Sequence, residues 1–123
     1  MQIFQAKWFA RWAVKEASLE QALRNAVFEM KQGLIDADLG NHIVKKRVGL
    51  RGRGKRGGVR TILAYTAKDR AFFLYGFAKN QRDTINEKEL QALKKMAAHL
   101  LVYDRRALDK AIELQELTEV RYE

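Results

Sequence analysis

Apolar residues in the first third of the chain recur every three or four positions, as they do along one face of a helix. Over about residues 6–16 this spacing places Phe9, Trp12 and Ala13 on one side, and a second apolar face runs from Leu19 to Met30. The pattern predicts two consecutive helices whose aromatic residues pack in the core rather than stack on nucleic-acid bases. Ahead of them, Ile3-Phe4 suits a short first strand.

The middle of the chain has the pattern of strands. Three stretches, His42–Val48, Val59–Thr66 and Arg70–Lys79, are rich in β-branched and aromatic residues and are separated by short polar or glycine-rich segments. Glycines at 52, 54, 57 and 58 follow Gly49, so we expect Gly49–Gly58 to be a flexible connection between the first two strands.

The C-terminal third returns to helical spacing. Asn86 and Glu89 are positioned as a capping box, and Ile85 and Leu90 as a hydrophobic staple, so a helix is expected to begin here. A further helix is expected over about residues 104–115, followed by a short edge strand or a frayed end. The element order predicts one α+β domain over residues 1–123, with an N-terminal helical hairpin packed on a small twisted antiparallel sheet and followed by C-terminal helices.

Charge is distributed unevenly along this domain. The chain has 123 residues and a formal net charge of +9. No acidic residue lies between Leu39 and Lys68, whereas the remaining residues carry fifteen basic and fifteen acidic side chains. Segregation on this scale predicts a polyanionic partner such as a nucleic acid, although a basic loop kept for solubility or covered by an acidic protein gives the same pattern. The basic residues of this block are Lys45, Lys46, Arg47, Arg51, Arg53, Lys55, Arg56, Arg60 and Lys68.

Several functional classes are disfavoured by composition. The chain has no cysteine, its two histidines lie in different predicted elements, and no carboxylate cluster accompanies them, so we expect no metal site and no cofactor. No apolar run approaches the roughly 18 residues of a membrane span. We therefore expect a cytoplasmic protein without a membrane partner.

The glycine-rich block imitates two nucleotide-binding motifs without their context. Gly49–Lys55 matches most of a P-loop, but Arg56 stands where a serine or threonine must bind Mg²⁺. Gly52–Gly57 spells the dinucleotide fingerprint. In both cases a strand is predicted where a helix N-terminus must receive the phosphate, so we reject both interpretations.

Strand alternation divides the basic block into two parts. Lys45 and Arg47 share one face of their predicted strand, while Lys46 takes the other. Arg60 begins the next strand, and antiparallel pairing can bring these side chains together. Guanidinium groups bind phosphate oxygens bidentately, and a lysine surrounded by other cations loses its proton more readily and can act as a base. Such a site can bind an RNA backbone or stabilise the charge that develops during cleavage by the 2′-OH, and the residues alone leave both possibilities open.

The chain resembles the RelE/HigB group of toxins from bacterial type II toxin–antitoxin systems, within the RelE/ParE superfamily. The resemblance is carried by the runs KKRVGLRGRGKRGGVRTILAY and FFLYGFAKNQRDTI and by the helix start NEKEL. It implies a compact α+β toxin that cleaves messenger RNA, typically on the ribosome, through attack of the 2′-OH on the adjacent phosphodiester. It also implies a cognate antitoxin as partner.

The resemblance also implies roles for individual residues. Arg60 corresponds to the family arginine that contacts the scissile phosphate, and Lys45 and Arg47 are candidates for the transition-state stabiliser and the base. Lys79 and Arg82 correspond to the basic pair after the last long strand. The remaining cations of the block are expected to bind RNA, namely Lys46, Arg51, Arg53, Lys55 and Arg56. A ParE-type gyrase inhibitor and a non-catalytic nucleic-acid-binding module of the same fold stay open as alternatives.

Overall fold

The computed structural model describes residues 1–14, 19–50, 54–66, 70–78, 81–82 and 84–120, with the backbone alone at 50 and 54–57. Six strands and four helices are defined over these residues. In chain order they are β1 (Gln2–Ala6), α1 (Lys7–Trp12), α2 (Leu19–Lys31), β2 (Ala37–Gly40), β3 (Ile43–Leu50), β4 (Gly54–Thr66), β5 (Arg70–Ala78), α3 (Glu87–Leu100), α4 (Arg105–Glu113) and β6 (Leu117–Val120).

All six strands join one mixed sheet in the order β2-β3-β4-β5-β1-β6. β1 runs parallel to β5 and antiparallel to β6, and the other neighbouring pairs are antiparallel. The prediction of an N-terminal helical hairpin on an antiparallel sheet is therefore wrong. The chain opens with a strand that lies inside the sheet, and α3 and α4 both lie in its C-terminal half.

The physical reason for this error is the distance in sequence between β1 and its partners. β1 has only five residues, and it pairs with strands that begin at Arg70 and Leu117. No turn signal links it to either strand, because parallel neighbours are joined by long crossovers rather than by hairpins. Ile3 and Phe4 are both fully buried, one on each face of the sheet.

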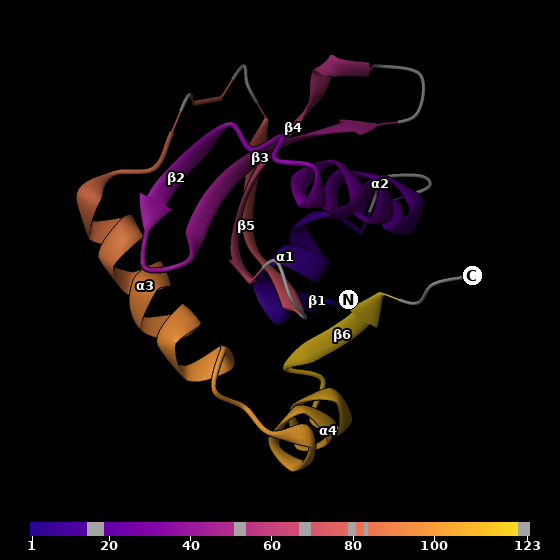
Figure 1. Ribbon diagram of the computed structural model, residues 1–123, viewed down its shortest axis with the longest axis vertical. Coiled ribbons are helices and arrows are strands. Elements are labelled where there is room, and N and C mark those ends of the chain that lie inside the picture. Colours follow the sequence, from indigo (N-terminus) through magenta and orange to yellow (C-terminus); the bar gives the residue numbers. More distant parts are fainter. Residues whose placement is uncertain (15–18, 51–53, 67–69, 79–80, 83, 121–123) are drawn as a thin grey trace.

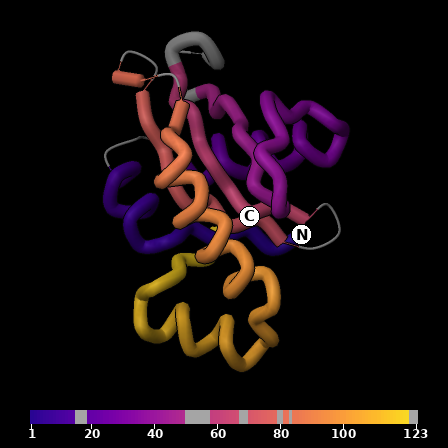
Figure 2. The backbone as a smooth tube through the Cα atoms, turned by 90° about the vertical axis from the view of Figure 1, so that its left-hand side faces the viewer, coloured from indigo at the N-terminus to yellow at the C-terminus, as the bar shows by residue number. Residues whose placement is uncertain are grey.

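Helices cover both faces of the sheet (Figure 1). The first core cluster joins α2 and part of α1 to one face, with Phe9, Leu23 and Phe73 buried between them. The second joins α3 and α4 to the opposite face, where Phe72 and Leu108 are fully buried. Figure 2 shows α3 crossing in front of the strands, with α4 packed below them. No helix within the described residues is long and apolar enough to cross a membrane.

Sequence spacing located most of the other elements, although it did not predict β2. β3, β4 and β5 cover the three predicted strands, and Asn86 and Glu89 form the expected capping box at the start of α3. Ile85 and Leu90 pack in the second core cluster, and β6 lies at the edge of the sheet. Phe9 and Ala13 are buried as expected, and Gly33 ends α2 with a positive φ of 92°.

The glycine-rich segment is more ordered than its composition indicates. β3 extends to Leu50 and β4 begins at Gly54, so the two strands form a hairpin that projects beyond the rest of the sheet (Figure 1). The expected flexible connection is therefore wrong for the glycines of β4, while residues 51–53 lie outside the described part. Gly58 is required by close packing, since a Cβ there would lie 2.0 Å from the carbonyl oxygen of Val48.

We expect Gly58→Ala to lower the free energy of unfolding by about 2 kcal/mol, because the backbone of β3 must shift to admit the methyl group. Urea denaturation measures the change. Gly33→Ala is the comparison, since its Cβ would meet nothing within 4 Å and would cost only the strain of a positive φ, about 1 kcal/mol. A smaller loss at Gly58 than at Gly33 would contradict the close approach of the two strands.

Candidate functional site

Two neighbouring rows of side chains cross β3, β4 and β5 on the face that carries α3. In the first row Arg47 is directly opposite Arg60, which is directly opposite Phe77. In the second row Lys45 is opposite Ile62, and Ile62 is opposite Tyr75. Ile62 and Phe77 belong to the core cluster beneath α3, so strand alternation directs the three cations to this same face. The structure thus brings together three of the predicted site residues.

The opposition of Arg47 and Arg60 is unfavourable for the fold. Directly opposed residues of an antiparallel pair have Cβ atoms roughly 4.5–5.5 Å apart, and like charges at that distance repel. Arg47 is partly compensated, because its Nε lies 3.7 Å from Asp36 Oδ2 and its backbone N–H donates to the same oxygen at 2.6 Å. Arg60 is half-buried, and its side chain makes no hydrogen bond or ion pair with any described residue. An anion placed between the two guanidinium groups would relieve the repulsion.

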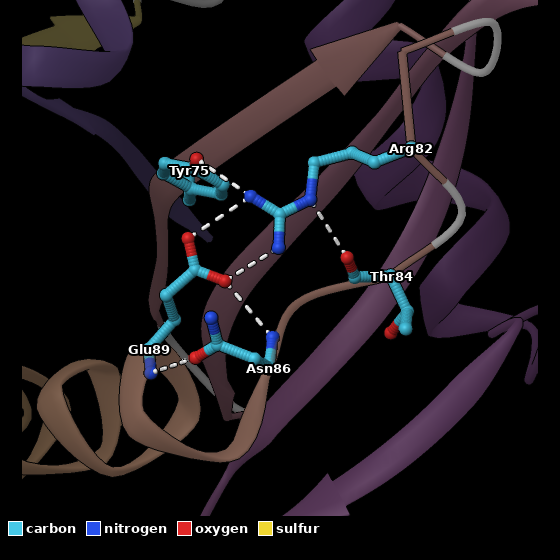
Figure 3. Close-up of polar contacts among 5 residues, drawn as sticks. All are labelled: Tyr75, Arg82, Thr84, Asn86 and Glu89. Carbon is cyan, nitrogen blue, oxygen red and sulfur yellow. Dashed lines mark hydrogen bonds and ion pairs between the residues drawn. The ribbon is translucent and has the colours of Figure 1, made fainter.

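Arg82 adds a fourth cation beside this row (Figure 3). It follows β5, and its guanidinium carbon lies 5.7 Å from the centre of the Phe77 ring. Its Nη1 and Nη2 donate to the two carboxylate oxygens of Glu89 at 3.0 and 2.5 Å. Nη1 also donates to the Tyr75 hydroxyl at 3.3 Å, and Nε donates to the carbonyl oxygen of Thr84 at 2.8 Å. Unlike Arg60, Arg82 is therefore held by several partners.

Glu89 performs two tasks at the start of α3. Its Oε1 accepts from the backbone N–H of Asn86 at 2.9 Å, which completes the capping box, and it also receives Arg82. The hydrogen bonds from Arg82 and from Asn86 lower the pKa of Glu89 below its usual value, and those to Glu89 raise the pKa of Arg82. The pair stays ionised at neutral pH and fixes the loop after β5 to α3.

Lys46 lies on the opposite face of the sheet from Lys45 and Arg47. Its ammonium group donates to Glu29 Oε1 at 2.8 Å and to the carbonyl oxygen of Leu34 at 2.9 Å. Its side chain is only 3% exposed. An RNA contact by Lys46 stays a prediction, while the observed contacts join β3 to α2 and to the segment after it.

The other predicted residues lie outside the described residues. These are Lys79, Arg51 and Arg53, together with the side chains of Lys55 and Arg56 in β4. Their assignment therefore stays a prediction.

Aromatic contacts extend the site toward α1, and sequence reasoning missed most of them. Tyr75 stacks on Trp8 with ring centres 4.6 Å apart, and Trp8 stacks on Trp12 at 6.0 Å. Tyr75 is half-buried between Trp8 and Phe77, so its ring is part of the packing at this site. The ion pair between Glu89 and Arg82 was also missed. The sequence predicts only a capping role for Glu89, because the spacing of residues within α3 does not indicate a partner in the loop after β5.

The chemistry available at this site is anion binding by fixed cations. Within the described residues no group of three or more His, Asp or Glu side chains is arranged to hold a metal ion. Lys45, Arg47 and Arg60 project from paired strands, and the guanidinium group of Arg82 is held by its hydrogen bonds to Glu89, Tyr75 and Thr84. Guanidinium groups in such positions can bind one phosphate bidentately and stabilise charge on its oxygens.

Comparison with known proteins places the chain in a family. The family model described as "RelE toxin of RelE / RelB toxin-antitoxin system" matches residues 1–120. None of the curated proteins matches the sequence. The family match covers every residue of the cation rows.

We expect Lys46→Ala to lower the free energy of unfolding by about 2 kcal/mol, because it removes a buried ammonium group that pairs with Glu29 and donates to the carbonyl oxygen of Leu34. Thermal or urea denaturation measures the loss. Lys45→Ala is the matched control on the same strand, and it should stay within about 0.5 kcal/mol of the parent chain. Equal stability of the two variants would contradict a structural role for Lys46.

We expect Arg82→Ala to raise the pKa of Glu89 toward its ordinary value, since the largest cause of its depression is removed. A carboxylate with a lowered pKa in the folded state stabilises the fold above its unfolded pKa, and this contribution is lost as pH falls through the folded pKa. The acid-induced loss of stability should therefore be smaller in the variant. Carbon-detected NMR titration of the Glu89 carboxyl measures the pKa, and an unchanged value would contradict the ion pair.

Proposed function

This chain belongs to the RelE toxin family, and we propose that it acts as a metal-independent endoribonuclease that cleaves messenger RNA on the ribosome. As a RelE toxin it is one half of a toxin–antitoxin system. The observation that carries the proposal is the opposition of Arg47 and Arg60 on neighbouring strands. Two like charges placed side by side disfavour folding, so we expect such a pair where both charges bind a ligand of opposite charge.

The proposed reaction uses the nucleophile that RNA itself supplies. The 2′-OH attacks the adjacent phosphorus and loses its proton to a base, while the bond from phosphorus to the 5′ oxygen breaks and that oxygen gains a proton. The products are a 2′,3′-cyclic phosphate and a 5′-OH. The guanidinium of Arg60, with no competing partner among the described residues, is the group we assign to the scissile phosphate. Arg47 supplies a second guanidinium group, so residues on two strands stabilise the negative charge that builds on the phosphate oxygens.

Lys45 is the candidate for proton transfer. It lies one row from Arg60 on the same face, diagonal to it across β3 and β4. No acidic side chain pairs with its ammonium group among the described residues, whereas Arg47 and Arg82 both have carboxylate partners. Lys45 is therefore free to approach the reacting 2′-OH.

The positive charge of the chain also supports the proposal of two partners, an antitoxin and the ribosome. A cognate antitoxin that places carboxylates over the cation rows would silence the toxin, and we propose that the type II antitoxin does so. The net charge of +9 would attract the toxin to the phosphate-rich surface of the ribosome.

Induced expression of the parent chain should arrest growth and produce cleaved messenger RNA, and Arg60→Ala should abolish both. The expected loss of cleavage is at least about 100-fold, the scale of a removed transition-state charge contact. The variant should fold at least as stably as the parent, because it removes the repulsion with Arg47. Growth curves and mapping of messenger RNA ends make the measurement.

Arg106→Ala is the matched control, since Arg106 is exposed on α4, away from the cation rows. It should remain fully toxic. Full toxicity of Arg60→Ala would overturn the site, whereas growth arrest with intact messenger RNA and damaged DNA would favour a gyrase inhibitor of the same fold. RNA binding without any cleaved product would favour a non-catalytic module.

A further inference from the structure

The guanidinium of Arg82 is almost fully occupied in the free protein. Four of its five N–H groups have acceptors, which are both oxygens of Glu89, the Tyr75 hydroxyl and the carbonyl oxygen of Thr84. One ring face of Phe77 lies under the group. Only one N–H, on Nη2, has no acceptor among the described residues.

The contact with Glu89 has the geometry that an arginine uses for phosphate. Two parallel N–H groups meet two oxygens of one anion, which is the fork-to-fork arrangement shared by carboxylates and phosphates. Glu89 therefore fills the position on Arg82 at which a phosphate oxygen pair would bind. Figure 3 shows the carboxylate facing the end of the guanidinium group.

We propose that Glu89 is an affinity-determining residue of this site, whose carboxylate occupies the fork of Arg82 until an RNA phosphate displaces it. The inference rests on the proposed function only in that the cation rows bind RNA. Arg82 is adjacent to the Arg47–Arg60 row through Phe77, so it is placed to take a phosphate next to the one held by Arg60.

The structure makes this exchange feasible. The side chains of Arg82 and Glu89 are 32% and 31% exposed, so water and ligand can reach the pair and the ion pair is screened. Glu89 also has a second partner, because its Oε1 accepts from the backbone N–H of Asn86. Once displaced from Arg82, the carboxylate can keep this capping bond, so the exchange does not unwind α3.

The test measures binding of a single-stranded 2′-O-methyl RNA, which has no free 2′-OH and cannot be cleaved by this route. Fluorescence anisotropy over a series of KCl concentrations gives both the affinity and its salt dependence. Glu89→Gln should bind roughly two- to five-fold more tightly than the parent, the range set by a partly exposed ion pair. The slope of log affinity against log salt should become steeper by about 0.7, as expected for one further phosphate contact.

Two further variants separate release of Arg82 from a simple change of charge. Glu87→Gln removes the same charge from the same helical turn, but Glu87 accepts from Gln91 rather than from Arg82, so its effect should be smaller. Arg82→Ala should bind more weakly than the parent, and adding Glu89→Gln to it should give no larger gain than Glu87→Gln gives to the parent. Glutamine still suits the capping box, so Glu89→Gln should keep α3 intact. If Glu89→Gln nevertheless folds poorly, Glu89→Asp is a second way to free Arg82, because it keeps the charge but shortens the side chain.

Equal affinity of Glu89→Gln and Glu87→Gln would overturn the inference, as would weaker binding by Glu89→Gln or survival of its full gain in the Arg82→Ala background. These outcomes are separate from those of the proposed function. Tighter binding by Glu89→Gln with no cleavage by the parent chain would refute the ribonuclease and leave the role of Glu89 intact.

Discussion

The site depends on the alternation of side chains along strands that are buried on both faces. Because helices cover each side of the sheet, the side chains of β3 from Ile43 to Val48 alternate between the side of α2 and the side of α3. Val44, Lys46 and Val48 face α2, so Lys45 and Arg47 must face the other way. A shift of one residue in the pairing would exchange the two sets and place two apolar side chains among the cations. The pairing register thus fixes both the core and the charge cluster.

The same alternation explains which parts of the structure the sequence predicts. Local signals define β3, β4, β5 and the start of α3, since each depends on residues a few positions apart. The division of the basic strand into Lys45 and Arg47 on one face and Lys46 on the other followed from strand periodicity alone. By contrast, the place of β1 depends on strands that begin at Arg70 and Leu117, and no local pattern encodes that pairing.

Site residues show the same limit. The excess positive charge is visible in the sequence, but the sequence does not show which basic residues pair with acidic residues. Lys46 and Arg60 look alike in the sequence, yet one is buried against Glu29 and the other has no described partner. Glu29 lies in α2, far from the basic block along the chain. A cation can stabilise the fold or remain available to a ligand. Which of the two it does depends on acidic residues that only the tertiary structure brings close to it.

Cations that look alike in the sequence consequently differ in how far each is already neutralised. Arg60 has no described partner, Arg47 shares the carboxylate of Asp36, Arg82 is bound bidentately by Glu89, and Lys46 is buried in an ion pair. A buried pair keeps its geometry because separating it exposes a charge to an apolar environment, whereas partly exposed pairs can exchange one anion for another. On the proposed function, an RNA phosphate would bind Arg60 without displacing a described partner, whereas it would compete with a carboxylate at Arg47 and at Arg82. Net charge alone does not express this ordering, because it counts all four cations equally.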